Sequence, residues 1–370
     1  MRRNHYFVFV FVALLALLFV MAGCAAPAAP TAAPAAPTTA PAQPTAEAAI
    51  TEVKRAADGS YPGLWNLQPN GRIETAPFAN KKGYTLGVLN VGKQFPVVAA
   101  MDKGMDEAAK DMNLKILYGD GQGDAQKQIA QFEDFLAQKP DGIVLVALDA
   151  NAVIPQVEAA AKQGVPVLTC WNDLGGAPVA NLPPSVALIT FDEIENGRRI
   201  AREVLKLLPD GGKVAIIEGA AGFQASVDRS TGFKEVLAEN PKIEIVASQP
   251  GNWTRDAALA VAENVLQAHP DLNVIYAHDD SMALGAVDAL RNAKLLDKVK
   301  VFGLGAQAQA VDAIKKGELF GTLDYGPREQ MYGCMKAMVM SLEGVKLPSE
   351  MMFPAPPVTA SNADQFQFDW

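Results

Sequence analysis

Several residues with strong recognition chemistry stand directly after short apolar segments or turns of this sequence. An indole ring offers a flat apolar face and one N–H donor, whereas carboxylate and amide groups form directed hydrogen bonds with hydroxyls. Together these groups suit the noncovalent binding of a small polyhydroxylated molecule. The residues that fit this description are Trp171, Asn172, Asp173, Trp253 and Asp279.

Each of these candidates also has a purely structural alternative. Either tryptophan could pack inside a hydrophobic core, and the acids and the amide could cap loops or helices. Asp280 in particular is expected to cap a helix that begins near Ser281. A second group of weaker candidates offers neutral amide, hydroxyl or aromatic side chains: Gln94, Phe95, Gln224, Gln307 and Tyr325.

The sequence lacks signs of catalytic or metal chemistry. Beyond residue 23 it contains only two histidines, His269 and His278, with no Gly-x-Ser-x-Gly motif and no metal-spaced histidine cluster. The glycine-rich run 119–124 lacks the Lys-Ser/Thr pair of a phosphate loop and carries two acids, so it is interpreted as a strand-to-helix turn. The sequence therefore predicts no enzyme activity, no cofactor and no bound metal.

Two consecutive arrays of alternating strands and helices must position the candidates. Short β-branched segments bounded by Gly, Pro or Asp alternate with amphipathic helical periods, a pattern typical of parallel sheets covered on both faces. The first array has strands at 85–91, 115–119, 142–148 and 165–170, and helices at 97–111, 124–138 and 151–163. The second has strands at 186–190, 213–219, 244–249, 273–278, 299–304 and 320–324, and helices at 193–208, 225–239, 255–268, 281–293, 307–316 and 327–343.

These arrays predict an α/β protein with two doubly wound parallel-sheet lobes. In such sheets, ligands bind beyond the carboxyl ends of the strands. Trp171 and Asp279 follow strands directly, so we expect them at this edge, and facing edges of two lobes can line one cleft.

The first fifty residues predict export and a membrane anchor. Arg2 and Arg3 precede an apolar run at 6–22, which is short for a spanning helix and typical of a signal peptide. Met21-Ala22-Gly23-Cys24 resembles the bacterial lipoprotein signal, which implies cleavage after residue 23 and a diacylated Cys24; the alternative is an ordinary signal with an incidental cysteine. Residues 24–50 are rich in Ala, Pro and Thr and are interpreted as an extended tether of at most roughly 80 Å.

Charge and cysteine content narrow the function further. The formal charge of −9 becomes −11 when Arg2 and Arg3 are removed with the signal, which argues against nucleic-acid binding. Cys170 and Cys334 could form a disulfide, but both stand in apolar segments, and the sequence favours buried free thiols.

From 84 to 359 the sequence resembles the type I periplasmic sugar-binding proteins of ABC importers, of the ribose and galactose type. The resemblance rests on the order and spacing of several segments. They are Asp124-Ala125-Gln126-Lys127-Gln128 with the following FEDFLAQKPDGIVL, ANAVIPQVEAAAKQGVPVLT, Arg229-Ser230-Thr231-Gly232-Phe233, Gln249-Pro250 and ALAVAENVLQAHPDLNVIYAHDDSMALGA. It implies two lobes joined by a three-strand hinge, with crossovers near Phe191, Asp324 and Met352, and closure on a bound ligand.

The N-terminal composition, together with the lobes that the resemblance implies, predicts domain boundaries. The signal peptide spans 1–23, the tether 24–50 and an N-terminal extension 51–83, whose packing the sequence does not predict. The N-terminal lobe is expected to comprise 84–191 and 325–351. The C-terminal lobe and tail are expected to comprise 192–324 and 352–370.

Several ligand-contacting positions of the family carry other residues here. The family's Asn-Pro-Phe-Phe corresponds to Phe95-Pro96-Val97-Val98, and its Asp-Arg pair to Trp171-Asn172. The matching positions of its sugar-binding Arg, its late Asp and its final Gln are Val227, Gly305 and Tyr325, whereas Trp253 and Asp279 keep an aromatic and a polar group. The scaffold is therefore expected to persist while charged ligand contacts are replaced.

The expected function is capture of a small neutral sugar or polyol and its delivery to an ABC permease, at the outer face of the cytoplasmic membrane. A nucleoside or other aromatic-bearing neutral solute is the alternative ligand, and docking to a membrane receptor is the alternative role. A third possibility is an enzyme built on the same scaffold, but this sequence shows no group of residues that could form a catalytic site. A sugar-responsive repressor would need a DNA-binding segment where the signal and tether stand.

Overall fold

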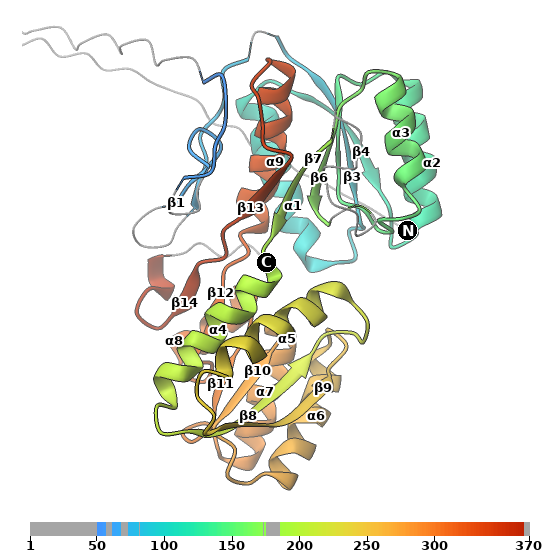
Figure 1. Cartoon of the computed structure of the whole chain (residues 1–370). Coiled ribbons are helices and arrows are strands. Elements are labelled where there is room, and N and C mark those ends of the chain that lie inside the picture. The colour runs from blue at the N-terminus through green and yellow to red at the C-terminus, as the bar shows by residue number, and fades with distance from the viewer. Residues whose placement is uncertain are drawn as a thin grey trace, which may run out of the picture. The chain divides into compact units, whose positions relative to one another are not determined.

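Two six-stranded sheets form the framework of the computed structural model (Figure 1). The structure describes residues 50–56, 61–67, 73–80, 82–172, 174 and 186–365, all within one unit, Ala49–Trp370. The interpretations of Cys24, of the signal and of the tether fall outside the described residues. The two-lobed α/β fold predicted from the sequence is confirmed, and every strand and helix predicted between 85 and 343 is present.

The first sheet consists entirely of parallel strands, in the order β13-β7-β6-β5-β3-β4. Its strands are β3 (Thr85–Asn90), β4 (Lys115–Asp120), β5 (Gly142–Leu145), β6 (Val167–Trp171), β7 (Val186–Phe191) and β13 (Glu350–Phe353). Alternate side chains enter opposite faces: Val88 and Val144 belong to one buried cluster, Leu89 and Leu145 to the other. The covering helices are α1 (Pro96–Asp111), α9 (Pro327–Leu342), α2 (Ala125–Ala137) and α3 (Ile154–Lys162).

The second sheet repeats this plan in the order β14-β12-β11-β10-β8-β9, with only β14 antiparallel to its neighbour. Its strands are β8 (Gly212–Glu218), β9 (Ile243–Pro250), β10 (Val274–Ala277), β11 (Lys300–Phe302), β12 (Gly321–Leu323) and β14 (Pro357–Thr359). The helices of this lobe are α4 (Glu193–Leu207), α5 (Gln224–Leu237), α6 (Arg255–Ala268), α7 (Asp280–Ala293) and α8 (Ala308–Lys315), followed by a short 3-10 turn, η2 (Ala363–Gln365). No helix among the described residues is long and apolar enough to cross a membrane.

The chain passes between the sheets three times. It leaves the first sheet after β7, returns between β12 and α9, and leaves again between β13 and β14. Met352 lies inside β13, paired with Thr190 of the first sheet, so the last passage runs through residues 354–356, slightly beyond the expected position.

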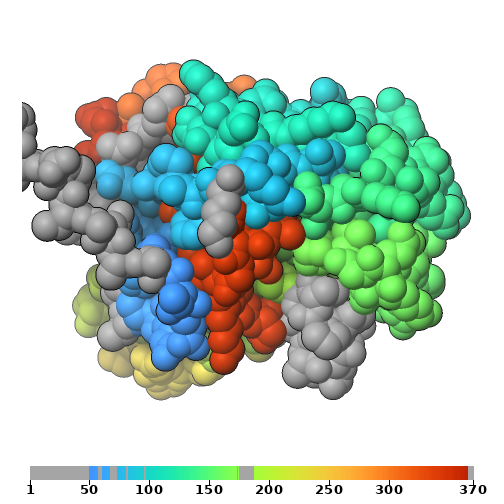
Figure 2. Space-filling model, turned by 90° about the horizontal axis from the view of Figure 1, so that it is seen from above, coloured from blue at the N-terminus to red at the C-terminus, as the bar shows by residue number. Residues whose placement is uncertain are grey.

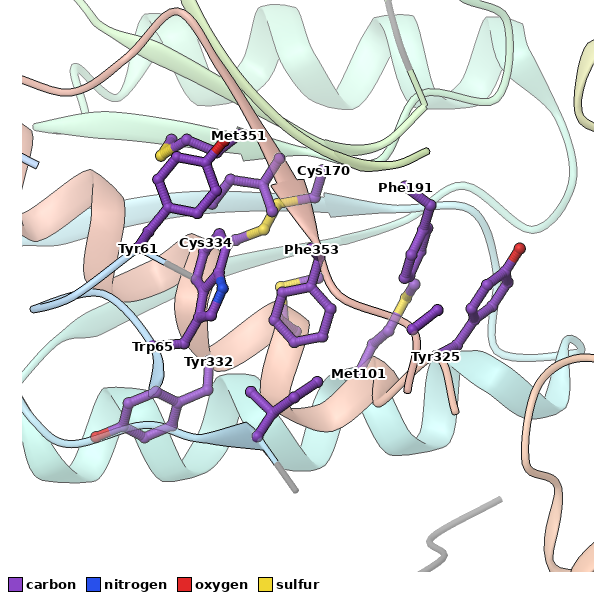
Figure 3. Close-up of a cluster of buried hydrophobic side chains, with 14 of the residues drawn as sticks. Tyr61, Trp65, Met101, Cys170, Phe191, Tyr325, Tyr332, Cys334, Met351 and Phe353 are labelled. Carbon is purple, nitrogen blue, oxygen red and sulfur yellow. A yellow bond between two sulfur atoms is a disulfide. The ribbon is translucent and has the colours of Figure 1, made fainter. Parts of the chain in front are cut away.

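The N-terminal extension packs against the first lobe, on α9 and β13. Trp65 is buried between Tyr61 and Phe353, with both ring centroids 5.1 Å away (Figure 3). A β-bridge joins Glu52 to Lys346, and the short strands β1 (Asn66–Leu67) and β2 (Ile73–Glu74) form an antiparallel pair. In Figure 2 this extension, in blue, lies beside the red C-terminal segments of the chain.

A disulfide joins Cys170, in β6, to Cys334, in the middle of α9 (Figure 3). The expectation of two free thiols is therefore wrong. The cysteines are 164 residues apart in the sequence, but α9 packs directly on β5 and β6 and brings their Cα atoms to 6.5 Å, within bridging range. The chain segment between them includes the whole second sheet except β14.

Removing this disulfide should destabilise the protein strongly, because it closes a loop of 164 residues. We expect the Cys170→Ala/Cys334→Ala double variant to lose about 2–5 kcal/mol of unfolding free energy in urea denaturation. The wild type, unfolded with and without reductant, is the matched control. Equal denaturation midpoints in the oxidised and reduced wild type would contradict this prediction.

Candidate ligand-binding site

The first sheet presents Trp171 and Asn172 at the carboxyl end of β6. Trp171 adopts a positive φ of 72°, and its carbonyl accepts a hydrogen bond from Thr190 Oγ1 at 2.7 Å. Asn172 Nδ2 donates to the carbonyl of Ala147 at 2.7 Å, so this amide ties β6 to the end of β5. Asp173 lies outside the described residues. Both described residues stand at the predicted edge, but one N–H of the Asn172 amide already has a partner.

Trp171 is half-buried against the segments that connect the lobes. Its ring meets Phe191 and Tyr325 edge-on, with centroids at 5.2 Å and 5.6 Å. Phe191 in turn stacks on Tyr325 at 4.0 Å. One part of this indole therefore packs in the hinge, and the remainder is accessible.

The second sheet presents Trp253 in the turn after β9. The ring lies directly over the end of β8, where a Cβ atom on Gly219 would come within 2.0 Å of Trp253 Cζ2. Only glycine at position 219 leaves room for this placement. Phe223 meets the same indole edge-on at 5.8 Å. Trp253 is thus held over the end of β8.

A buried ion pair lies beneath these aromatic rings. Arg229 donates to Glu193 from Nε at 2.9 Å and from Nη2 at 2.7 Å, and its Nη1 donates to the carbonyl of His278 at 2.5 Å. Tyr325 donates its hydroxyl proton to Glu193 at 2.6 Å and accepts a hydrogen bond from Arg229. The guanidinium also lies over the rings of Trp253 and Tyr325, 5.4 Å from each centroid. Contacts therefore run continuously from Trp253 through Arg229 and Tyr325 to Trp171.

The opposite charges of Arg229 and Glu193 cancel within the ion pair. Burial opposes ionisation of Glu193, but the charge of Arg229 and the hydrogen bonds from Arg229, Tyr325 and Asn196 lower the pKa of its carboxyl below the usual value. Both partners therefore stay charged, and each neutralises the other. The network offers a ligand little net charge.

Asp279, and not Asp280, caps α7. Asp279 caps α7 by accepting a hydrogen bond from the Met282 amide at 2.7 Å, and burial raises the pKa of its half-buried carboxyl. Asp280 is fully buried, accepts from Thr322 Oγ1 at 2.6 Å and from the Gln307 amide at 2.8 Å, and burial raises its pKa to about 7. The expectation that Asp280 caps the helix is wrong, because its side chain turns inward to β12 and α8.

The weaker candidates are divided between surface and interior. Gln94 and Gln224 are exposed, and Gln224 Nε2 donates to Asp228 at 2.7 Å. The side chain of Gln307 contacts Ser281 Oγ at 3.2 Å. Tyr325 is only 4% exposed, because its hydroxyl belongs to the ion-pair network.

At the strand ends Phe223 stands out, which the sequence did not mark, beside Val227, which occupies the position of the family's sugar-binding Arg. Among the described residues three large apolar side chains are exposed: Phe95 at 42%, Phe223 at 53% and Val227 at 47%. Phe95 follows the end of β3, and the other two begin α5 after β8. A phenylalanine directly before a helix, where a capping residue is usual, was the available signal for Phe223.

Two cavities lie away from these strand ends. One, of about 290 Å³, lies between α4 and the β12–β14 edge. The other, of about 540 Å³, lies between the extension and the segment before β13. In the part of the chain that the structure describes, no group of three or more His, Cys, Asp or Glu side chains could hold a metal ion.

Known proteins share this sequence pattern and fold. A family model described as a periplasmic binding protein domain matches residues 86–346. The ribose import binding protein of Bacillus subtilis is 30% identical over 262 residues, covering 71% of this chain and 83% of that protein.

Solved structures agree. A solute-binding protein from Actinobacillus succinogenes with bound D-allose matches with a TM-score of 0.69 and 29% identity, over 77% of this chain and all of that one. One from Bacillus halodurans with bound myo-inositol matches with a TM-score of 0.66 and 26% identity, over 77% and 97% of the two chains.

Replacing one partner of the buried ion pair should lower the unfolding free energy more than replacing both partners. Arg229→Met leaves the Glu193 carboxylate buried without its partner, so we expect a loss of about 3–5 kcal/mol of unfolding free energy in urea denaturation. The Arg229→Met/Glu193→Gln double variant removes the unpaired charge and should recover part of that loss.

The exposed pair of Arg255 and Asp288, at 2.7 Å, provides a matched control. Arg255→Met should lose less than about 1 kcal/mol, because water screens this pair. Equal losses of unfolding free energy in Arg229→Met and Arg255→Met would contradict the prediction that the buried pair is more sensitive to loss of one partner than the exposed pair.

Proposed function

The chain belongs to the periplasmic binding protein family, and from that membership we propose that it captures a neutral sugar or polyol between its lobes and delivers it to the permease of an ABC importer. The relatives support this ligand class, since they include a ribose import protein and structures holding D-allose and myo-inositol. Reversible binding with lobe closure requires no catalytic group.

One observation carries the proposal for this chain: the contacts that run from Trp253 through Arg229 and Tyr325 to Trp171. They bring an indole from each lobe to the two sides of one buried network. Indole faces suit the C–H faces of sugars and polyols. Because Glu193 neutralises Arg229, the network favours a ligand without net charge.

The hinge passes through the same network. Glu193 follows the first passage between lobes, and Tyr325 lies in the second. Closing of the lobes therefore pivots about residues that also support the indole rings. A bound ligand that touches both rings stabilises the closed form, which is the state that a permease recognises.

Calorimetric titration with pentoses, hexoses, polyols and nucleosides tests the function. We expect one neutral polyhydroxylated compound to bind with a Kd near micromolar, about −8 kcal/mol. At 100 times Kd it should stabilise the protein by about 2.7 kcal/mol in thermal unfolding. Trp253→Ala should weaken binding at least tenfold, whereas Trp65→Phe, in the extension, should leave Kd unchanged. The absence of binding by every neutral compound would refute the proposal.

We also propose that the protein is anchored to the outer face of the cytoplasmic membrane through a diacylated Cys24. The Met21-Ala22-Gly23-Cys24 motif and the Pro-rich segment after it support this arrangement. In bacterial expression, the wild type should incorporate labelled palmitate and sediment with membranes. Cys24→Ala should lose the label and its membrane attachment, and retention of both by this variant would contradict the anchor.

A further inference from the structure

Two helices begin at the strand ends with an exposed phenylalanine in place of a capping residue. Asp124, Asp192, Thr254 and Asp279 cap α2, α4, α6 and α7 through side-chain hydrogen bonds. Phe95 and Phe223 stand at the same position before α1 and α5 and make no such bond. A polar cap would stabilise each helix, and a phenyl ring that stays 42% or 53% exposed gains less from folding than a buried one.

These two positions are equivalent in the two lobes. α1 follows β3 and α5 follows β8, and each of these strands is fifth in the order of its sheet. The exposed large apolar side chains of the described chain are Phe95, Phe223 and Val227. They are therefore confined to the edge where this fold binds ligands, and folding stability does not explain them.

The second lobe presents two adjoining aromatic rings and an exposed valine at this edge. Phe223 meets Trp253 edge-on at 5.8 Å, and Val227 follows one turn later on the same helix. Trp253 itself is fixed by Gly219 beneath it and by the Arg229 guanidinium. The two rings form a preformed corner that a flat apolar group can occupy by face and edge contacts.

The polar groups nearby are partly engaged within the protein. Arg229 is bonded to Glu193, Tyr325 and the His278 carbonyl. The amides of Asn172 and Gln224 each donate one N–H within the protein, to Ala147 and Asp228. These side chains therefore keep only part of their hydrogen-bonding capacity for the hydroxyls of a ligand.

Resting on the function proposed above, we infer that the natural ligand joins its hydroxylated part to an aromatic group, as aryl glycosides and nucleosides do. The corner of Phe223, Val227 and Trp253 receives the aromatic group. Trp171 and Asp279 remain for the hydroxylated part. The shared chemistry is a sugar bonded to a planar ring, through oxygen in one source and through nitrogen in the other.

Matched ligand pairs test this inference by calorimetric titration of the full exported chain. One arm compares methyl with phenyl β-D-glucopyranoside, and the other compares methyl β-D-ribofuranoside with adenosine and uridine. We expect the aromatic member of at least one arm to bind at least tenfold more tightly than its methyl counterpart. The arm that responds identifies the source as a glycoside or a nucleoside.

Variants connect the preference to the corner. Phe223→Ala should reduce the aromatic-to-methyl affinity ratio at least fivefold and leave the methyl compound within about twofold of the wild type. Val227→Ser provides a second variant that keeps Phe223. Because each ratio is measured within one variant, a general loss of stability does not alter it.

Four results would overturn the inference. Equal affinities for the methyl and aromatic members in both arms would do so while leaving sugar capture intact. Equal weakening of both members by Phe223→Ala would assign the ring to lobe closure instead. Binding of a simple sugar or polyol but of no aromatic derivative would exclude the corner as a subsite, whereas binding of no compound at all would refute the proposed function as well.

Discussion

The buried ion pair between Arg229 and Glu193 is the constraint on which the site depends. Removing two charges from water costs several kcal/mol per ion, and only close geometry with further hydrogen bonds compensates for it. Here Tyr325 and the His278 carbonyl supply those bonds. The pair consequently fixes the start of α4, the first turns of α5 and the second passage between the lobes. Both indoles rest on this fixed group, Trp253 on the guanidinium and Trp171 on the ring of Tyr325.

Most of the fold could be predicted from the sequence because its elements are strongly periodic. The apolar runs 142–148 and 273–278 contain the buried strands β5 and β10, and the helices between strands carry one apolar face. The prediction did not include β13 and β14, since 350–353 and 357–359 are short and show no alternation. Nor could local pattern reveal the Cys170–Cys334 bridge, because their proximity arises only when α9 returns to pack on the first sheet. The packing of Trp65 on Phe353 depends on the same return.

The site was predictable in position but not in the partners of each residue. Trp171 and Asp279 could be assigned to strand ends because parallel strands share one carboxyl edge. Which of Asp279 and Asp280 faces inward depends on Thr322, 42 residues further along the chain. Arg229 was recognised only as part of a sequence motif, since its partners Glu193 and Tyr325 lie 36 and 96 residues away. Side-chain pairing over such separations is a property of the packed structure, and no spacing in the sequence records it.

The two lobes hold their tryptophan rings in place by different interactions. In both lobes an exposed phenylalanine, Phe95 or Phe223, precedes a helix, so α1 and α5 lack a side-chain cap and the rings contribute little burial energy. In the first lobe the disulfide anchors β6 one residue before Trp171, and the extension covers β13 and α9. Among the described residues, the second lobe has neither device, and the ion pair together with Gly219 holds Trp253 there. The first lobe is therefore the covalently braced half of the site. The orientation of the aromatic corner in the second lobe depends on electrostatics, so its geometry is the more sensitive to any change at Arg229.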